Sequence, residues 1–436
     1  MPPRPLRRRI ALGLAALGAL VLSAAPAKAS PEDVLGFGAR SIAMGATGAA
    51  GSEGYESVHG NPGLLSTARS RQLTFGFVGA AFDIHAKEKI PTGALHGSII
   101  GATLPLPFAG VLKDRIAIGL GFFTPTDLVV RGRILYPEKT QFPLVDRVQS
   151  VAVQAGLGVD LGHGIRAGGG FAALAALSGA VLVATDAAGR IGTVVEDTLV
   201  ASYGPIVGLS YDLGDSWRVG ATFRGELVGR FNVVITVKDL GALTVPPLNI
   251  SGIAQYDPWQ IALELARVKG ALRVAAGATF KRWSAYPGLS EATVRCPLFD
   301  ATGQVFSDSC DARGPEKPGY SDTVSVHAGV ERRFEPRPGV GLRARGGLFF
   351  EPTPAPRQTG TANVYDSSRL AVSAGYGVTL GAPFPPIDLD LFSQLQWLLP
   401  REHVKDASVP ATNAGAPSVT VSGLLASFGL TAGARF

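Results

Sequence analysis

The chain has 436 residues, of which 46% are hydrophobic and 17% are charged, and its formal net charge is +6. Its first 29 residues hold five basic residues and no acidic one, so the remaining residues, 35 basic and 34 acidic, are nearly neutral. The positive charge therefore gives no support to a nucleic-acid-binding function, and the apolar content is too high for a disordered chain.

The N-terminal segment, residues 1–29, has the three parts of a secretory signal peptide. Basic residues from Arg4 to Arg9 precede an apolar stretch from Ile10 to Leu22, and the A-x-A sequence Ala27-Lys28-Ala29 marks a cleavage site. We expect the mature chain to begin near Ser30 and to leave the cytoplasm.

The next segment, residues 30–70, is dominated by small residues and shows no alternation of apolar and polar positions. Because small side chains bury little area, this segment needs close packing inside a larger structure. Beyond the signal peptide, the sequence has no clean apolar run of 18 residues that would predict a transmembrane helix.

From residue 71 onward, apolar and polar residues alternate with the period of two that is typical of β-strands. We predict fourteen strands, at residues 71–83, 93–105, 115–124, 147–160, 165–182, 193–212, 217–239, 248–267, 272–283, 323–334, 340–351, 368–381, 387–398 and 419–436.

The connections between these strands alternate in length. Those after even-numbered strands are mostly short and carry turn sequences such as L-G-D-S at residues 213–216, whereas those after odd-numbered strands reach the length of residues 284–322. This alternation and the even strand count predict an all-β fold, a 14-stranded antiparallel barrel over residues 71–436. Such barrels lie in the outer membrane of Gram-negative bacteria, in contact with its lipid.

The last predicted strand ends the chain on Phe436. Every second residue from Leu424 to Phe436 is apolar, and the strand is long enough to cross a bilayer. We predict that it closes the barrel, that Phe436 joins the aromatic girdle, and that the outer-membrane assembly machinery acts on it. An amphipathic strand of a soluble sandwich is the alternative.

Charged residues fall on the inward face of several predicted strands. Arg343 and Arg345 share that face of one strand, and Asp388 and Asp390 share that of another. A basic residue facing lipid near mid-bilayer would cost about 2–4 kcal/mol, which this arrangement avoids. Inward charges of both signs are usually a structural lattice of ion pairs.

Cys296 and Cys310 are the only cysteines, and both lie in the longest predicted outer loop. An exported chain reaches an oxidising compartment, so we predict a disulfide between them. It would close a loop of about 15 residues and contribute about 3 kcal/mol in the chain-entropy model. No histidine stands at ligand spacing beside them, and no metal site is predicted.

The sequence contains no G-x-S-x-G, H-E-x-x-H or G-x-x-x-x-G-K-[ST] motif, and its six histidines are scattered singly. His327 is predicted to face inward, where a lone histidine is more often a hydrogen-bonded lumen residue than a catalytic base. We therefore predict a protein that is not an enzyme and has no cofactor.

Three stretches of the chain resemble the FadL/TodX-type outer-membrane transporters of long-chain fatty acids and other hydrophobic compounds. They are the small-residue segment that ends in G-N-P-G-L-L at residues 60–65, W-S-A-Y at residues 283–286, and L-R-A-R-G-G-L-F-F-E-P-T-P-A-P at residues 342–356 with D-S-S-R-L-A-V-S-A-G-Y-G at residues 366–377. The N-P-A-x-L motif of the family appears here with Gly63 in third place. With the fourteen strands, the resemblance spans nearly all of the mature chain.

The resemblance implies a barrel whose lumen holds an N-terminal hatch, residues 30–70. It also implies passive uptake of a hydrophobic small molecule, which leaves sideways into the membrane through a gap at the third strand. On this basis the hatch motif is Asn61, Pro62 and Gly63, and the candidates for the gap are Gly119, Gly121 and Pro125.

The resemblance also implies an internal binding pocket. Its candidate lining residues are Leu174, Ala176 and Leu182, and the candidates to pair with a carboxylate head are Arg343, Arg345, Arg224 and Lys281. The plug motif is shared with related barrels that serve in protein secretion, so a secretion-associated or structural barrel is an alternative. A general porin is a further one, against which the plug argues.

Overall fold

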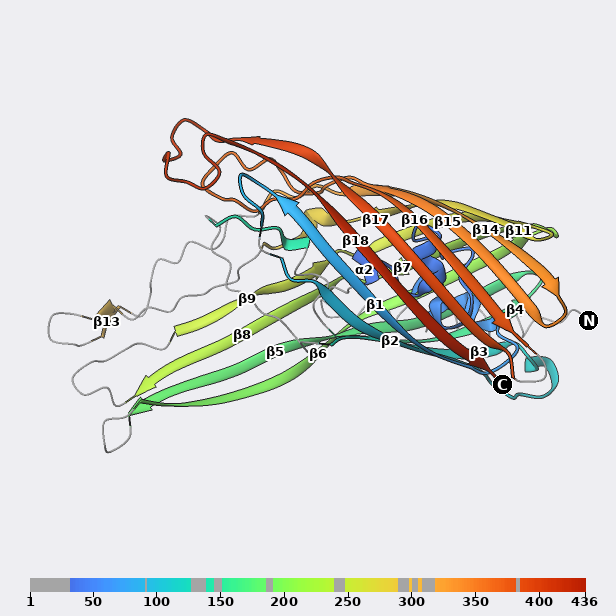
Figure 1. Ribbon diagram of the computed structural model, residues 1–436. Coiled ribbons are helices and arrows are strands. Elements are labelled where there is room, and N and C mark those ends of the chain that lie inside the picture. The colour runs from blue at the N-terminus through green and yellow to red at the C-terminus, as the bar shows by residue number, and fades with distance from the viewer. Residues whose placement is uncertain are drawn as a thin grey trace, which may run out of the picture.

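A computed structural model describes residues 32–90, 92–126, 139–144, 151–185, 191–238, 248–288, 298–299, 305–307, 318–381 and 385–436. One large sheet dominates it (Figure 1). Its strands are β1 (Gln72–His85), β2 (Leu95–Pro105), β3 (Ile116–Pro125), β4 (Ala152–Gly162), β5 (Ile165–Thr185), β6 (Ile191–Leu213), β7 (Trp217–Arg224), β8 (Leu227–Lys238), β9 (Leu248–Asp257), β10 (Gln260–Lys269), β11 (Leu272–Lys281), β14 (Thr323–Arg337), β15 (Val340–Glu351), β16 (Arg369–Leu380), β17 (Ile387–Val404) and β18 (Ser418–Arg435). A separate two-stranded sheet consists of β12 (Leu298–Phe299) and β13 (Val305–Ser307). The predicted signal peptide and both cysteines lie outside the described residues, so the disulfide stays a prediction.

The large sheet closes into a barrel. Strands β1 to β7 pair in chain order, β7 pairs with β10, and β10, β11 and β14 to β18 again pair in chain order. The pairing of β1 with β18 and that of β4 with β5 complete the ring. Gly225 and Glu226 separate β7 from β8, and Pro258 and Trp259 separate β9 from β10, so each pair continues as one barrel strand. The sixteen paired segments therefore make a 14-stranded antiparallel barrel, as the alternation predicted.

The wall has one apolar and one polar face. Leu120, Leu391 and Phe428 point outward and are more than half exposed, whereas Glu331 and Gln396 on the inward face are fully buried. The outward face is the lipid-facing band, and inward polar groups such as Glu331 and Gln396 pair with Arg345 and Arg369 of neighbouring strands.

The barrel departs from a simple up-and-down arrangement at Pro205 of β6. The ladder between β6 and β7 ends at the pair Ile206 and Arg224. The next residue on β6 is Pro205, which accepts a hydrogen bond from the Gly225 N–H (2.8 Å) but has no N–H to return. The ladder between these strands therefore stops here.

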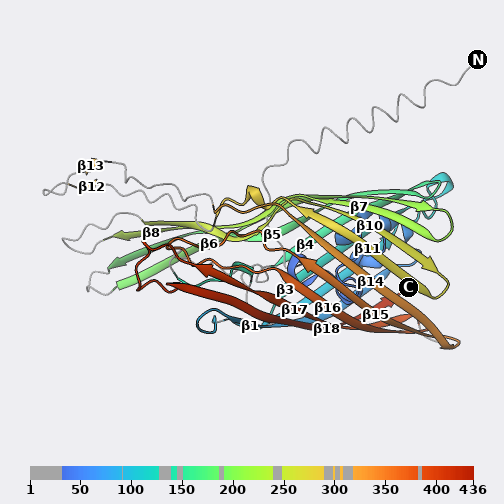
Figure 2. The same ribbon diagram turned by 90° about the horizontal axis from the view of Figure 1, so that it is seen from above.

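After this point β8 crosses β6 on the lumen side, over Gly204. A Cβ at Gly204 would lie 3.1 Å from the Glu226 carbonyl oxygen and 3.2 Å from the Leu227 Cγ, so the crossing is close at this glycine. Beyond it, β8 pairs in parallel with the opposite edge of β5. The strands β6, β5, β8 and β9 thereby form a sheet that projects past the barrel at the end away from the C-terminus (Figures 1 and 2).

The N-terminal hatch lies inside the barrel as short helical turns. They are α2 (Glu32–Leu35), α3 (Ala39–Ala43), η2 (Gly54–Glu56), α4 (Ser57–Gly60) and η3 (Pro62–Thr67), and Figure 1 shows them in blue behind the strands. Two further 3₁₀ turns, η4 (Gly110–Leu112) and η6 (Trp283–Ala285), lie in connections between strands. None of the helices among the described residues is long and apolar enough to cross a bilayer.

The hatch packs against the wall where the wall carries glycine. A Cβ on Gly347 of β15 would overlap the backbone of Met44 and Gly45, and a Cβ on Gly220 of β7 would overlap the carbonyl of Ala49. Backbone of the hatch and backbone of the wall therefore approach more closely than any side chain would allow.

Gly347→Val should displace the hatch, because overpacking of a tight interior costs about 1–3 kcal/mol. We expect the hatch to become accessible to protease in the folded, detergent-solubilised protein. The matched control is Gly346→Val on the same strand, since a Cβ there meets no heavy atom closer than 3.9 Å. Equal protease resistance of the two variants would contradict the packing argument.

Candidate functional site

Asn61 fastens the hatch to the barrel wall. Its side chain is fully buried, and its Nδ2 donates to the carbonyl oxygens of Ala49 in the hatch (2.6 Å) and Leu209 in β6 (2.8 Å). Its Oδ1 accepts from the Gly63 N–H (3.0 Å) and so caps η3, in which Pro62 takes the first position. The predicted motif residues Asn61, Pro62 and Gly63 thus lie together at the junction of hatch and wall.

Gly63 stands where the N-P-A-x-L motif has alanine, at a point of close contact between hatch and wall. A Cβ on Gly63 would lie 3.2 Å from the carbonyl oxygen of Arg166 and from the carbonyl carbon of Ala167. The wall opposite is itself glycine, since a Cβ on Gly168 would overlap the Gly63 nitrogen. Hatch and wall meet here through bare backbone on both sides.

Glu264 of β10 holds a second point of the hatch. Its carboxylate accepts hydrogen bonds from three consecutive backbone N–H groups, those of Gly48 (2.7 Å), Ala49 (3.2 Å) and Ala50 (3.0 Å). A carboxylate that accepts several backbone N–H groups makes charge-assisted hydrogen bonds, which are roughly twice as strong as neutral ones. The Nε2 of His327 lies 3.5 Å from the same carboxylate.

Arg40 extends this attachment into a lattice of ion pairs. Its Nε lies 3.0 Å from the Glu331 carboxylate, which also pairs with Arg345 (2.8 Å). Arg345 pairs in turn with Asp390 (2.6 Å), and Arg343 pairs with Asp388 (3.0 Å). Arg343 and Arg345 therefore have carboxylate partners within the protein. These pairs belong to a lattice of inward ion pairs, of the kind expected from the sequence.

Glu56 orients Arg40 from within the hatch. Its two carboxylate oxygens accept from the backbone N–H groups of Arg40 and Ser41, each at 2.9 Å. Burial raises the pKa of the Glu56 carboxyl to about 7, against the opposing charge of Arg40. This carboxyl therefore titrates near neutral pH beside the main cationic anchor of the hatch.

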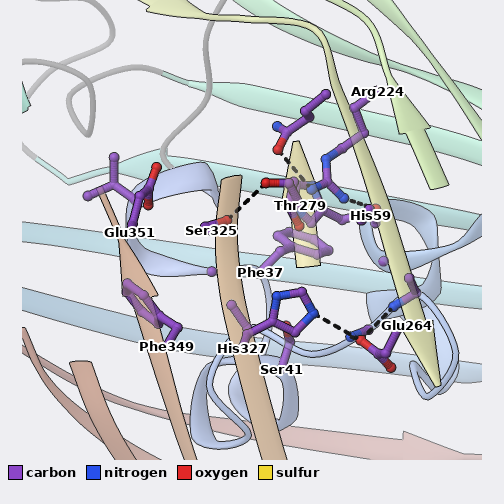
Figure 3. Close-up of a pocket in the computed structure, with 18 of the residues that line it drawn as sticks. Phe37, Ser41, His59, Arg224, Glu264, Thr279, Ser325, His327, Phe349 and Glu351 are labelled. Atoms are coloured by element: carbon purple, nitrogen blue, oxygen red, sulfur yellow. Dashed lines mark hydrogen bonds and ion pairs between the residues drawn. The ribbon is translucent and has the colours of Figure 1, made fainter. Parts of the chain in front are cut away.

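Among the described residues, the lumen has a space on each side of the hatch. The space at the C-terminal end of the barrel has a volume of about 450 Å³ and is lined largely by charged groups, including Arg343, Arg345 and Asp388. The space on the other side, which we call the upper cavity, has a volume of about 80 Å³ and is shown in Figure 3. A water occupies about 30 Å³ in the liquid, so the upper cavity as it stands holds only a few waters.

The wall side of the upper cavity is polar. Lys281 pairs with Glu351 (2.8 Å), which also pairs with Arg369. Arg224 donates to the His59 carbonyl oxygen in the hatch (3.1 Å), and Figure 3 shows this contact crossing from the wall to the hatch. Of the predicted carboxylate partners, Arg224 and Lys281 line this cavity, and Arg343 and Arg345 line the charged space beyond the hatch.

The opposite side of the upper cavity is apolar. Val34, Leu35 and Phe37 of the hatch and Phe349 of β15 line it. The hatch residues continue into a large buried apolar cluster, which we call the apolar lumen. Its wall members include Val78 and Phe82 of β1, Ile99 of β2, Phe123 of β3, Ile206 of β6, Phe392 and Leu398 of β17, and Leu425 of β18.

The three predicted pocket residues on β5 are not brought together. Leu174 is buried in the apolar lumen. Leu182 lies in the projecting part of β5, half-buried and opposite Thr236 of β8, and the side chain of Ala176 lies outside the described residues. A common pocket for these three residues stays a prediction.

The glycines of β3 accommodate the hatch. A Cβ on Gly119 would lie 2.5 Å from Leu65 and from Val58, and a Cβ on Gly121 would overlap the ring of Phe37. The ladders from β3 to β2 and to β4 run without a register shift through both glycines, and Pro125 ends the strand. The wall at β3 is closed here, so a gap at these residues would require hydrogen bonds to break, and it stays a prediction.

Sequence reasoning missed the roles of Arg40 and Glu264. The signal for Glu264 is a single inward glutamate in a strand whose other inward residues are Gln260, Ala262 and Ala266. Its partners are backbone groups of the hatch, which no side-chain pattern reveals. Among the described residues, no group of three or more His, Cys, Asp or Glu side chains is placed to hold a metal ion.

A transmembrane barrel whose lumen is stoppered by its own N-terminal segment defines a plugged outer-membrane channel. The family model described as outer membrane protein transport protein (OMPP1/FadL/TodX) matches residues 18–391. The chain belongs to this family, and it is an outer-membrane channel for hydrophobic compounds and not an enzyme.

Solved structures share the fold at low identity. A Pseudomonas aeruginosa FadL homologue has a TM-score of 0.59 at 14% identity, covering 94% of this chain and 99% of its own. The P. putida toluene transporter TodX has a TM-score of 0.53 and the Ralstonia pickettii toluene transporter TbuX has one of 0.52. Each is 16% identical to this chain, and each comparison covers 93% of this chain and 99% of the other. A search of curated protein sequences gave no match.

Asn61→Ala should loosen the hatch. The change leaves the buried carbonyls of Ala49 and Leu209 without this donor and the Gly63 N–H without this acceptor, and each buried group left unpaired costs about 1–3 kcal/mol. We expect a higher small-ion conductance in planar bilayers. Asn413→Ala, in an outer loop where Asn413 bonds the Thr361 carbonyl, is the control and should conduct like the unchanged protein. Conductance that Asn61→Ala leaves unchanged would count against this anchor.

Proposed function

We propose that this channel takes up long-chain fatty acids, or other compounds with a long apolar part and one polar end, by passive diffusion and releases them sideways into the membrane. The observation that carries the proposal is the junction of the apolar lumen with the cationic side chains of the upper cavity, Lys281 and Arg224.

The apolar lumen supports a long hydrocarbon chain as the cargo. Each CH₂ group that leaves water for an apolar environment gains about 0.8 kcal/mol, so a chain of many such groups favours this lumen over water. The polar end would then lie near Lys281 and Arg224. Lys281 donates to Glu351 and Arg224 donates to Gln260, and a ligand carboxylate could accept from the same two cationic groups.

A monoaromatic hydrocarbon is the second candidate, since two of the similar structures are named as toluene transporters. Toluene has no hydrogen-bonding group, and an apolar ligand pressed against Lys281 and Glu351 would interrupt charged contacts without replacing them. The polar wall of the upper cavity therefore favours the fatty acid.

Ligand binding would require part of the hatch to move and enlarge the upper cavity. Small-molecule pockets commonly have volumes of about 300–1,000 Å³, and the upper cavity is smaller than that. The hatch side chains that line it on the apolar side are Val34, Leu35 and Phe37, from the start of the hatch. We propose that the cargo occupies the space that these three residues vacate.

The charges beyond the hatch support sideways release. The space at the C-terminal end of the barrel is lined by Arg343, Arg345, Asp388 and Asp390, and an apolar chain would gain nothing by entering it. An exit through the wall at β3, near Gly119 and Gly121, would keep the chain away from water throughout.

Lys281→Met should weaken the binding of a fatty acid such as oleate about tenfold or more, because a hydrogen bond to a charged group contributes about 1.5–3 kcal/mol. Toluene binding should not change. Both are measured on purified, detergent-solubilised protein, oleate by competition with a fluorescent fatty acid and toluene by calorimetry. The matched control is Lys269→Met, an exposed lysine at the end of β10, which should bind both ligands normally. Loss of toluene binding alone would favour the monoaromatic candidate.

A disulfide between β3 and β4 should block release if the exit lies there. Leu120 and Ala155 stand opposite each other, so the pair Leu120→Cys and Ala155→Cys, with Cys296 and Cys310 replaced by serine, locks this ladder when oxidised. We expect fatty-acid uptake by cells to fall on oxidation and to recover on reduction.

The control lock joins Leu348 and Val372, an opposed pair on β15 and β16 that also faces lipid. Cells with this control variant should take up fatty acid equally well in the oxidised and reduced states. Uptake that stays unaffected by the β3–β4 lock would remove this exit while leaving fatty-acid binding to be judged separately.

A further inference from the structure

The connection between β2 and β3, residues 106–115, differs from the other short turns at its end of the barrel. Its sequence is L-P-F-A-G-V-L-K-D-R, and it includes the 3₁₀ turn η4. The turn between β6 and β7 has only Gly214, Asp215 and Ser216, and the turn between β10 and β11 has only Gly270 and Ala271. We call residues 106–115 the apolar turn.

The apolar turn exposes three large hydrophobic side chains. Val111 at its tip is 83% exposed, and Leu112 and Phe108 are 46% and 45% exposed. Clustered apolar exposure of this kind marks an interaction surface rather than ordinary surface variation. Figures 1 and 2 both show this turn, in cyan, at the end of the barrel that holds the C-terminus.

The apolar turn is held in this shape by its own backbone. The Leu106 N–H donates to Ile116 (2.9 Å), the Lys113 N–H to Gly110 (3.2 Å) and the Arg115 N–H to Leu112 (3.2 Å), while the Arg115 carbonyl accepts from Asp160 (2.8 Å). The exposed side chains therefore keep a fixed position relative to the wall.

The exposed surface is continuous with the lipid-facing band. Leu104, at the end of β2, is 42% exposed on the outer face, and Leu120 continues the same face on β3. Phe108, Val111 and Leu112 carry this apolar surface beyond the strand ends. Because this surface continues the lipid-facing band, lipid is the partner that suits it best.

Cationic side chains accompany these apolar residues. Lys113 is exposed and Arg115 is half-buried in the turn itself, and Arg69 reaches the Asp114 carbonyl oxygen from the hatch side (3.4 Å). Basic side chains beside apolar ones suit the boundary of a leaflet, where hydrocarbon meets phosphate.

We propose that the apolar turn is a membrane anchor on the periplasmic side. Phe108, Val111 and Leu112 insert into the periplasmic leaflet of the outer membrane, and Lys113 and Arg115 contact the phosphates of its phospholipids. The anchor fixes the depth of the barrel at β2 and β3. A periplasmic protein seated on the same surface is the competing occupant, and the test separates the two.

The test places an environment-sensitive NBD label at Val111→Cys, with Cys296→Ser and Cys310→Ser in the background. The folded protein is reconstituted into vesicles of phosphatidylethanolamine and phosphatidylglycerol. Quenching by spin labels on the acyl chains and by aqueous iodide is then compared with two reference sites. These are Leu120→Cys in the lipid-facing band and Asp215→Cys on the polar turn between β6 and β7.

The label at Val111 should be quenched by the acyl-chain spin label as strongly as the label at Leu120, and little by iodide. A second position, Leu112→Cys, should behave in the same way. Iodide quenching equal to that at Asp215 would overturn the proposal. A second result would also overturn it: iodide quenches the label at Val111 in vesicles, and this quenching falls only when a periplasmic extract is added. The occupant of the turn would then be a protein.

Discussion

The hatch can occupy the lumen only because the wall forms hydrogen bonds with its backbone polar groups. A segment of short turns leaves many N–H and C=O groups unpaired within itself, and those buried against the wall need partners on the wall. Glu264 accepts three such N–H groups, and Asn61 and Thr222 join hatch backbone to wall, the latter through the Gly60 carbonyl oxygen. Glycines on the wall make these contacts sterically possible.

These attachments divide the lumen into two environments. On one side of the hatch lie the apolar lumen and the upper cavity, and on the other lie Arg343, Arg345 and their carboxylate partners. The ion-pair lattice lines the charged side, and Arg40 joins it to the hatch through Glu331. The same residues that hold the hatch in place therefore make the far side of the lumen unfavourable for an apolar solute.

The fourteen strands were predictable because alternation is a local property, and the strand at residues 340–351 has the predicted bounds. The inward position of Arg345 was predictable for the same reason. Its partners Glu331 and Asp390 were not, because pairing depends on register between strands far apart in sequence. The predicted single strand at residues 217–239 is interrupted because its neighbour presents Pro205, an effect that one strand's pattern cannot show.

The passage of β8 across the inner face of β6 carries a consequence for biogenesis. A strand that lies on the inside of a cylinder has to be threaded there while the cylinder is still an open ribbon. The seam between β1 and β18 joins the first and last strands of the barrel, so we expect it to close last. We therefore expect the contact between β5 and β8 to form before β1 and β18 pair during assembly of the barrel.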